Sequence, residues 1–275
     1  MQRAIHAILL DLNEADGVAK IILNRPERRN AMNQDIVLGF MAALEEIRAN
    51  DRIGCLLTMA AGGIAFSAGM DLFEMRDHHA HPEKYPNWLD ITIMHETIRT
   101  FPKVTVAVVD GFCVGGGMTL VASHDLAIAS DKAEFGLPEV IRGSYATNAT
   151  PVLQKHIPLK KLFYLNLTGR NMDAAEAERA GLVSKVVPKE ELQNYAYTLA
   201  KEVAGHSRTA MQFGKEVAYA ARDMNYEDAW QYSRRRSREL HEVADPLTDV
   251  EGYLKSQKRG TASYEGIGYR RPEDR

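Results

Sequence analysis

The sequence predicts an α/β core followed by a helical region, and two observations support this prediction. In the first half, short β-prone runs alternate with glycine-containing turns and helical patterns, which is typical of a sheet with parallel strands. After about residue 150 the pattern changes, because helical segments then follow one another. We therefore expect a core over residues 1–200 and a helical region with a polar tail over residues 201–275.

The first elements are a hairpin, a helix and three buried strands. The runs Ala4–Leu12 and Val18–Leu23 are separated by a segment that ends in Asp-Gly, a strong turn signal. Asn33–Asn50 carries an apolar stripe at helical spacing, with Asn33 placed to cap the helix. The predicted buried strands are Gly54–Met59, Val104–Val109 and Leu126–Ala129.

The second half is punctuated by glycine and proline residues, which divide it into five predicted helices. These helices are Lys160–Leu167, Ala174–Ala180, Lys189–Ala204, Thr209–Ala221 and Tyr226–Val243. Earlier in the chain, a polar stretch that contains His78, His79 and His81 is expected to be a solvated loop. His124 lies just before a predicted strand and is expected to have a structural role.

Composition and charge exclude several classes of protein. The chain has 275 residues, of which 45% are hydrophobic and 26% charged, and its formal net charge is −3. This balance does not indicate nucleic-acid or membrane binding. Cys55 and Cys113 lie in apolar stretches and are expected to be buried thiols. No apolar run approaches the ~20 residues of a membrane helix, and the start lacks a signal-peptide pattern, so we expect a cytoplasmic protein.

Two glycine-containing segments are candidates for binding an anionic oxygen. Val104–Val109 leads into Gly115-Gly116-Gly117 and then into an apolar, helix-compatible stretch. A strand, a glycine turn and a helix start expose backbone N–H groups that attract negative charge. Gly69 lies in a similar strand-to-turn segment, Ala65–Leu72. Two such segments can direct two N–H groups at one oxygen. A tight turn that serves only packing is the alternative interpretation.

Glu139 is the candidate acid/base group. It follows Pro138 and lies between two apolar segments, Phe135–Leu137 and Val140-Ile141. Partial burial raises the pKa of a carboxyl group toward the range useful for proton transfer. A surface glutamate after a turn explains the local sequence equally well.

Five segments together resemble successive signatures of the crotonase (enoyl-CoA hydratase/isomerase) superfamily, and they occur in that family's order. They are Leu23–Ala31, Phe66–Leu72, Gly111–Gly117, Asp125–Ala129 and Phe135–Glu139. The segment Ala180–Val183, followed by Val186-Val187-Pro188, resembles the family's entry into its C-terminal helices. The resemblance covers nearly the whole chain, and the ordered set is far more specific than any single segment.

The resemblance implies a spiral of ββα turns, followed by helices that mediate homotrimers or dimers of trimers. It implies an acyl-CoA substrate whose thioester oxygen is bound by the N–H groups of Met70 and Gly116. Arg28, Ala68 and Leu72 fall where the family contacts coenzyme A, which is part of the substrate. No metal or redox cofactor is implied. Near the C-terminus, the basic residues expected to meet CoA phosphates are Lys255, Lys258 and Arg259.

Thr119 departs from the family pattern. Typical hydratases in this family carry one glutamate at this position and a second at the position of Glu139. A threonine hydroxyl forms hydrogen bonds but is not a general base near neutral pH. The sequence therefore predicts a site with a single acid/base glutamate. Tyr145, in a loop that also departs from the common family sequence, is a candidate contact of the acyl group.

The predicted activity is that of a hydratase or lyase acting on an α,β-unsaturated CoA thioester. The alternatives are a Δ3,Δ2-enoyl-CoA isomerase, which also uses a single glutamate, and a non-catalytic acyl-CoA-binding homologue. The sequence also resembles the hydroxycinnamoyl-CoA hydratase-lyase branch, which hydrates its substrate and then cleaves a C–C bond. That branch uses a tyrosine from a C-terminal helix. The nearest tyrosines here are Tyr226 and Tyr232, and Arg234 is the other candidate for the matching position.

Overall fold

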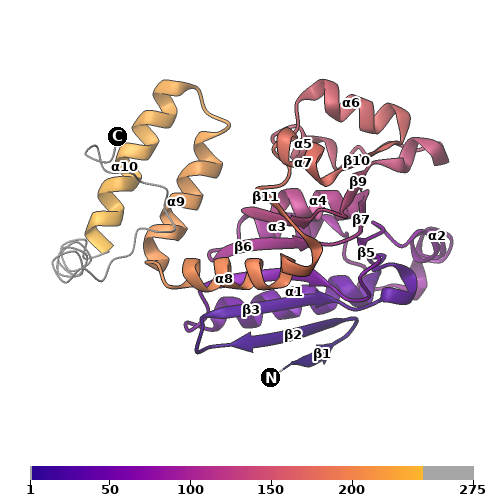
Figure 1. Ribbon diagram of the computed structural model, residues 1–275, viewed down its shortest axis with the longest axis horizontal. Coiled ribbons are helices and arrows are strands. Elements are labelled where there is room, and N and C mark those ends of the chain that lie inside the picture. The colour runs from indigo at the N-terminus through magenta and orange to yellow at the C-terminus, as the bar shows by residue number, and fades with distance from the viewer. Residues whose placement is uncertain (1, 244–275) are drawn as a thin grey trace. The chain divides into compact units, whose positions relative to one another are not determined.

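The protein is described by a computed structural model that covers residues 2–243 (Figure 1). The chain forms two compact units, Met1–Arg208 and Thr209–Arg275. The first unit contains both sheets and the helices up to α8, and the second contains most of α9 and all of α10. The positions predicted to meet CoA phosphates, Lys255, Lys258 and Arg259, lie outside the described residues, as does most of the predicted polar tail.

The larger sheet has seven strands in the order β1-β2-β3-β4-β6-β8-β11. The first three strands pair antiparallel, and the strands from β3 onward pair parallel. Their bounds are β1 Arg3–Ile5, β2 Ile8–Asn13, β3 Val18–Leu23, β4 Cys55–Ala60, β6 Val104–Val109, β8 Leu126–Ser130 and β11 Lys185–Val187. The predicted hairpin and the three predicted buried strands are therefore present.

One strand prediction is wrong, because the run Ala4–Leu12 forms two strands. The chain reverses at His6, whose φ of 51° is in the left-handed region, and Ile5 then pairs with Ile8. The local residues are β-prone throughout, so nothing in their propensity marks this turn.

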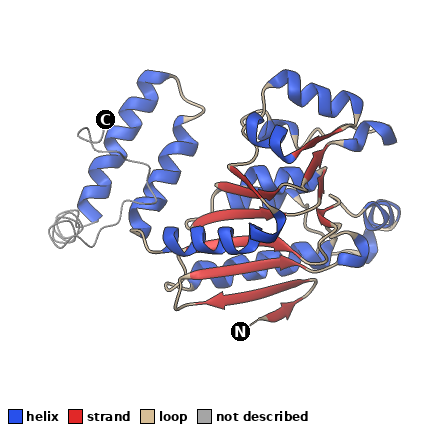
Figure 2. Cartoon of the chain, in the orientation of Figure 1, coloured by secondary structure: helices blue, strands red, loops and turns tan. Residues whose placement is uncertain are grey.

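A second sheet of four short strands, which are labelled in Figure 1 and drawn in red in Figure 2, has the order β10-β9-β7-β5. Its strands are β5 Ala65–Ser67, β7 Phe112–Val114, β9 Glu134–Gly136 and β10 Asn171–Asp173. Each long parallel strand β4, β6 and β8 is followed by one short strand and then by a helical element. This repeated ββα unit confirms the predicted architecture.

Several helices of the first unit begin on side-chain caps. Asn33 accepts a hydrogen bond from the Ile36 N–H and caps α1, whose apolar stripe is buried as predicted. The helices are α1 Gln34–Ala49, α2 Leu72–Ala80, α3 Thr92–Arg99, α4 Gly116–Ser123, α5 Thr150–Leu153, α6 Leu159–Thr168, α7 Ala174–Ala180 and α8 Leu192–Ala204. The short 3-10 helices are η1 Pro26–Arg28, η2 Pro82–Lys84, η3 Pro138–Arg142 and η4 Lys189–Glu191.

The histidine-containing stretch is not a loop, because His78 and His79 belong to α2. The Asp71 carboxylate caps this helix by accepting hydrogen bonds from the Phe73 and Glu74 N–H groups. The His78 ring stacks on Trp88 with a centroid separation of 3.9 Å. Capping and aromatic stacking thus organise a segment that its polar composition alone did not mark as helical.

Two smaller sequence predictions agree with the structure. His124 is buried, and its ring contacts the Leu120 carbonyl at 2.7 Å and the Thr58 hydroxyl at 2.8 Å, so it has a structural role. Cys55 and Cys113 are both buried free thiols. Among residues 2–243, no helix is long and apolar enough to span a membrane.

In the second unit, α9 (Arg208–Ala221) and α10 (Tyr226–Val243) form a helical pair. The Arg236 guanidinium lies 4.2 Å from the centre of the Phe213 ring and forms an ion pair with Glu216, which joins the two helices. Neither helix contains a buried residue. The candidate positions Tyr226, Tyr232 and Arg234 all lie on α10.

Candidate functional site

A cavity of about 540 Å³ gathers nearly all the predicted site residues. Its walls come from the β5–α2 and β7–α4 segments, from α3, and from η3 with the loop that follows. The predicted residues that line it are Ala68, Met70, Leu72, Gly116, Thr119, Glu139 and Tyr145. Arg28 does not line this cavity. It lies in η1, with its guanidinium 6.0 Å from the Phe73 ring of α2.

The first amide segment is held by a short parallel bridge between Met32 and Met70. The Met32 N–H donates to the Gly69 carbonyl at 2.7 Å, and the Asp71 N–H donates to the Met32 carbonyl at 3.0 Å. Because Met32 bonds to the residues on either side of Met70, the Met70 N–H is directed away from it. The bridge therefore fixes the backbone of Met70 and leaves its N–H available.

The second amide segment is the turn from β7 into α4. Gly115 has a φ of 56°, which favours glycine, and its N–H donates to the Gly136 carbonyl at 2.9 Å. Gly116 is the first residue of α4, so its N–H has no partner within the helix. Within residues 2–243, neither the Gly116 N–H nor the Met70 N–H donates a hydrogen bond to another group.

The two amide segments lie against each other. A Cβ atom added to Gly69 would be 3.2 Å from the Gly116 nitrogen, and one added to Gly116 would be 3.8 Å from the Gly69 Cα. Two available backbone N–H groups therefore flank the same end of the cavity. Such a pair can stabilise an oxygen that becomes negatively charged, as in an oxyanion hole.

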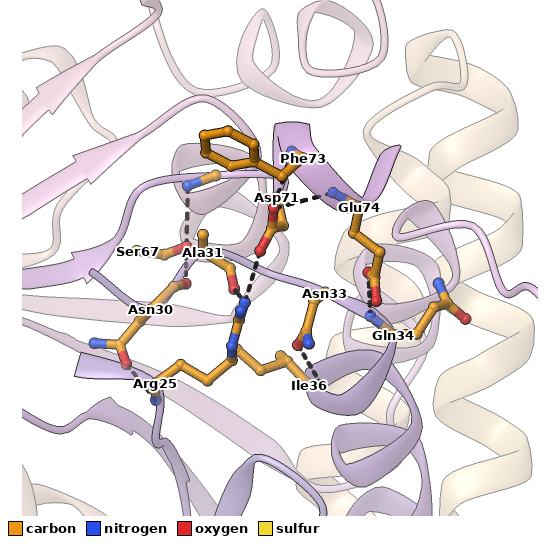
Figure 3. Close-up of polar contacts among 11 residues, drawn as sticks. Arg25, Asn30, Ala31, Asn33, Gln34, Ile36, Ser67, Asp71, Phe73 and Glu74 are labelled. Carbon is orange, nitrogen blue, oxygen red and sulfur yellow. Dashed lines mark hydrogen bonds and ion pairs between the residues drawn. The ribbon is translucent and has the colours of Figure 1, made fainter. Parts of the chain in front are cut away.

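The buried polar side chains of Asn30 and Ser67 form hydrogen bonds that hold the first amide segment in place (Figure 3). The Asn30 amide donates to the carbonyls of Ala61 and Ala65 at 2.9 and 2.8 Å. The Ser67 hydroxyl donates to the Asn30 carbonyl at 2.9 Å and accepts from the Gly69 N–H at 3.1 Å. These bonds connect the turn after β3 to the residue that precedes Met70.

An ion pair fixes the other side of this segment. The Arg25 guanidinium contacts the Asp71 carboxylate at 3.0 Å and donates to the Ala31 carbonyl at 2.6 Å (Figure 3). Burial opposes ionisation of Asp71, but the hydrogen bond from Arg25 and those from the Glu74 and Phe73 N–H groups outweigh it and lower the pKa. Asp71 therefore remains ionised and links α2 to the segment that contains Met70.

Glu139 lies in η3 and packs directly against the second amide segment. A Cβ atom added to Gly115 would lie 2.7 Å from the Glu139 Oε1. Oε2 is buried and has no hydrogen-bond partner among the described residues. Burial raises the pKa of Glu139, while its own backbone and the charge of Arg142 oppose that shift. The carboxyl group is thus placed for proton exchange with a molecule in the cavity.

Thr119 and Tyr145 occupy different parts of the cavity. Thr119 is on α4, one turn after Gly116, and is 2% exposed. Tyr145 is half-buried in the loop after η3. The same loop contributes Asn148 to the lining. The cavity lining therefore has a hydroxyl at the position where the family resemblance leads one to expect a second carboxylate.

The sequence did not indicate His95 as a site residue, but His95 lines the cavity from α3. It is 6% exposed, and its Nε2 atom has no partner among the described residues. Burial lowers the pKa of His95 to about 4, so the imidazole is neutral at physiological pH. Its sequence signal was weak, because it occupies the apolar face of a short helix, where a histidine usually serves packing. Arg76 and Arg142 also line the cavity.

Comparison with known proteins gives a consistent result. Residues 13–259 match the family described as enoyl-CoA hydratase/isomerase. A protein of Thermus thermophilus named putative enoyl-CoA hydratase is 30% identical over 246 residues, which are 89% of this chain and 97% of that protein. The rat mitochondrial protein named enoyl-CoA hydratase domain-containing protein 3 is 34% identical, over 77% of this chain and 70% of its own length.

Solved structures show the same fold. The human enoyl-coenzyme A hydratase domain-containing protein 3 superposes with a TM-score of 0.82 at 27% identity, over 91% of this chain and 98% of the other. An enoyl-CoA hydratase subunit from Geobacillus kaustophilus also gives a TM-score of 0.82, at 29% identity, over 91% and 95% of the two chains.

Proposed function

Because this chain belongs to the enoyl-CoA hydratase/isomerase family of the crotonase superfamily, we propose that it is a hydro-lyase that hydrates an α,β-unsaturated acyl-CoA thioester. Acyl-CoA substrates and hydratase-type chemistry follow from membership of the family. The observation that supports the finer assignment is the position of Glu139. Glu139 lines the cavity, and its Oε1 atom packs against the segment that carries the Gly116 N–H.

The two amides stabilise the enolate that this reaction forms. Addition of a nucleophile to C3 of a 2-enoyl thioester moves the electron pair of the double bond toward the carbonyl, so negative charge collects on the thioester oxygen. The N–H groups of Met70 and Gly116 bind that oxygen more strongly as its charge grows. A single donor of this kind contributes about 3 kcal/mol to lowering a barrier.

Glu139 transfers the proton. As a carboxylate it removes a proton from water while the water oxygen bonds to C3, and as a carboxylic acid it then returns a proton to C2. The net reaction adds H and OH across the double bond and restores the carboxylate. A pKa raised by burial makes the carboxylate a stronger base at the moment it removes the proton.

The remaining predicted residues bind the substrate. Ala68 and Leu72, on either side of the first amide segment, contact the part of coenzyme A next to the thioester, and Arg28 contacts the nucleotide portion outside the cavity. Tyr145 contacts the acyl group, and the Thr119 hydroxyl forms a hydrogen bond within the cavity. The reaction written above requires no cofactor besides the coenzyme A of the substrate.

The direct test is Glu139→Gln, which keeps the size of the side chain but removes its basicity. We expect kcat for hydration of a 2-enoyl-CoA to fall by about 10²–10⁴-fold, while acyl-CoA binding is retained. Glu190→Gln, on the exposed surface of η4, is the matched control and is expected to keep full activity. Near-normal turnover of the Glu139 variant contradicts the proposal.

Isomerisation is the second candidate function, because Thr119 stands where a second carboxylate is expected. Moving a double bond from C3 to C2 needs only a single proton carrier and no water. Incubation of 2-enoyl-CoA and 3-enoyl-CoA in ¹⁸O-labelled water separates the two activities. Label in the product indicates hydration, and double-bond migration without label indicates an isomerase. A hydroxycinnamoyl thioester in the same set tests for hydration followed by C–C cleavage. Acyl-CoA binding without turnover of any thioester indicates a non-catalytic homologue.

We further propose that the protein assembles as a homotrimer or a dimer of trimers through its C-terminal helices. The proposal follows from the family resemblance and from the absence of buried residues in α9 and α10. The cytoplasmic location expected from the sequence stays a prediction, since the relatives include a protein named as mitochondrial.

A further inference from the structure

A second residue with a buried, unpartnered atom lines the same cavity as the proposed acid/base. Among the described residues, the buried side-chain atoms that lack a hydrogen bond include His95 Nε2 and Glu139 Oε2, and both residues line the cavity. A polar atom that is buried and unpaired lowers stability, so proteins usually satisfy it with a bound molecule. The proposed proton transfer uses the Glu139 atom and leaves the His95 atom without a function.

His95 and Thr119 line the cavity from two helices that pack on each other, α3 and α4. The Ile91 Cδ1 atom, just before α3, lies 3.4 Å from the Cβ position of Gly116, at the start of α4. His95 follows Ile91 by one turn, as Thr119 follows Gly116. The imidazole and the Thr119 hydroxyl therefore border the same space.

The imidazole offers a hydrogen-bond acceptor that does not titrate near neutral pH. A neutral ring has one N–H and one nitrogen lone pair. The Gly116 backbone raises the pKa of the ring, as a carbonyl does when a ring N–H donates to it. Nε2 has no partner among the described residues, so in the tautomer that carries its proton on Nδ1 the Nε2 lone pair is free. Nε2 can therefore accept a hydrogen bond from an O–H group.

We propose that His95, together with Thr119, positions the water that adds to C3 and so replaces the missing second carboxylate as a hydrogen-bond acceptor. Nε2 accepts one hydrogen of the water, and Glu139 removes the other as the oxygen bonds to C3. The hydrogen held by Nε2 remains in the hydroxyl group of the 3-hydroxyacyl product. His95 keeps the same protonation state throughout. This inference rests on the proposed hydratase activity.

The inference separates two reactions of the same enolate. Exchange of a C2 proton needs Glu139 and the two amides but no positioned water, whereas hydration needs all of them. Replacing His95 is therefore expected to impair hydration and to spare C2 exchange. A residue that only maintains the shape of the cavity would affect both reactions alike.

The test compares His95→Phe and His95→Gln with the wild type. Hydration is measured as kcat and KM with the 2-enoyl-CoA that the wild type hydrates fastest, and C2 exchange is measured in D₂O with the saturated acyl-CoA of the same length. We expect His95→Phe to lower kcat for hydration by about 10²-fold with little change in KM. Its C2 exchange rate is expected to stay within about threefold of wild type, and the amide oxygen in His95→Gln is expected to restore part of the loss.

Thermal unfolding provides a control for structural damage. Phenylalanine removes an unpaired buried nitrogen and also the interaction of the ring with the Gly116 backbone, so the melting temperature of His95→Phe is expected to stay close to that of the wild type. Met94→Leu, at a fully buried neighbour on α3 that does not line the cavity, is the packing control and is expected to keep both reactions.

Three outcomes overturn the inference, and they are distinguishable. Wild-type hydration by His95→Phe rules out a role in holding water. Parallel loss of hydration and C2 exchange identifies a packing role. Failure of the wild-type protein to incorporate ¹⁸O from labelled water into any 2-enoyl-CoA rejects the proposed hydratase activity itself, and the inference with it.

Discussion

At the scale of single residues, the site depends on glycines that allow close approach rather than on side-chain chemistry alone. Gly115 combines a φ of 56° with a Cβ position only 2.7 Å from the Glu139 carboxylate. Gly69 similarly allows its segment to approach the Gly116 amide. The proposed roles of Met70 and Gly116 use backbone N–H groups, so a conservative change of the Met70 side chain says little about catalysis. The informative substitutions alter the backbone or the space beside it.

We expect Gly115→Ala to lower activity and stability together. The new methyl group would displace the Glu139 carboxylate, and the positive φ adds strain on the order of 1–3 kcal/mol. A misplacement of about 1 Å can reduce turnover by roughly 10²-fold. Hydration kinetics and urea unfolding measure the two effects.

Gly63→Ala is the matched control for this substitution. Gly63 also has a positive φ, 66°, but no atom lies within 4 Å of its Cβ position. It is expected to show the backbone strain without the loss of turnover. Equal losses of activity in both variants would contradict a specific contact between position 115 and Glu139.

At the scale of elements, the network beneath the β5–α2 segment connects helix capping to the position of the Met70 N–H (Figure 3). Asp71 serves three purposes, because its carboxylate caps α2 and pairs with Arg25 while its N–H bonds to Met32. The helix, the turn after β3 and the amide segment are therefore coupled. A change at Asp71 affects both the stability of this region and the geometry of the cavity.

We expect Asp71→Ala to destabilise the protein by about 3–5 kcal/mol, because Arg25 would remain largely buried without its partner. Asp71→Asn keeps an oxygen for the cap and is expected to cost less. Both variants are expected to lower kcat for hydration, since the segment that holds Met70 loses its support. Chemical denaturation and steady-state kinetics provide the measurements.

Asp77→Ala, near the other end of α2, tests whether any lost carboxylate on this helix has the same effect. Its partners are the exposed Lys84 and the Tyr85 hydroxyl, and an ion pair at the surface contributes little to stability. Unchanged activity of Asp77→Ala beside reduced activity of Asp71→Ala would locate the effect at the amide segment. The opposite order would contradict the proposed support.

At the scale of the whole molecule, the two units differ in how they bury apolar surface. The first unit has a continuous core between α1, the large sheet and the helices around it. In the second unit, α9 and α10 contain no buried residue, and Trp230 and Tyr226 are 52% and 81% exposed. Exposed aromatic surface on paired helices is typical of a face that another protein surface covers.

We expect the full chain to sediment as a trimer or hexamer, and Trp230→Glu to shift it toward smaller species because a charge would enter the apolar interface. Gln231→Glu adds the same charge on a different side of α10 and is expected to leave assembly unchanged. Sedimentation equilibrium over a range of concentrations measures both. A monomeric wild-type protein would contradict the proposed assembly.

The fold was largely predictable because its longer elements carry local signals. These signals can be read from short stretches of sequence. They are the six-residue apolar strands, the Asn33 cap and the glycines at helix ends. The second sheet was not predicted, since three-residue strands such as β5 and β7 have too few residues to show a period. They form because the first sheet and the glycine turns bring their backbones together.

The sequence by itself determined the α/β class, the order of the two amide segments and the presence of one carboxylate with Thr119 in place of a second. Only the tertiary structure decided that Gly69 and Glu139 both lie against Gly115, and that His95, which has a buried unpaired nitrogen, lines the same cavity. The physical reason is that periodicity and turn chemistry are local, whereas burial and proximity depend on contacts between segments far apart in the chain.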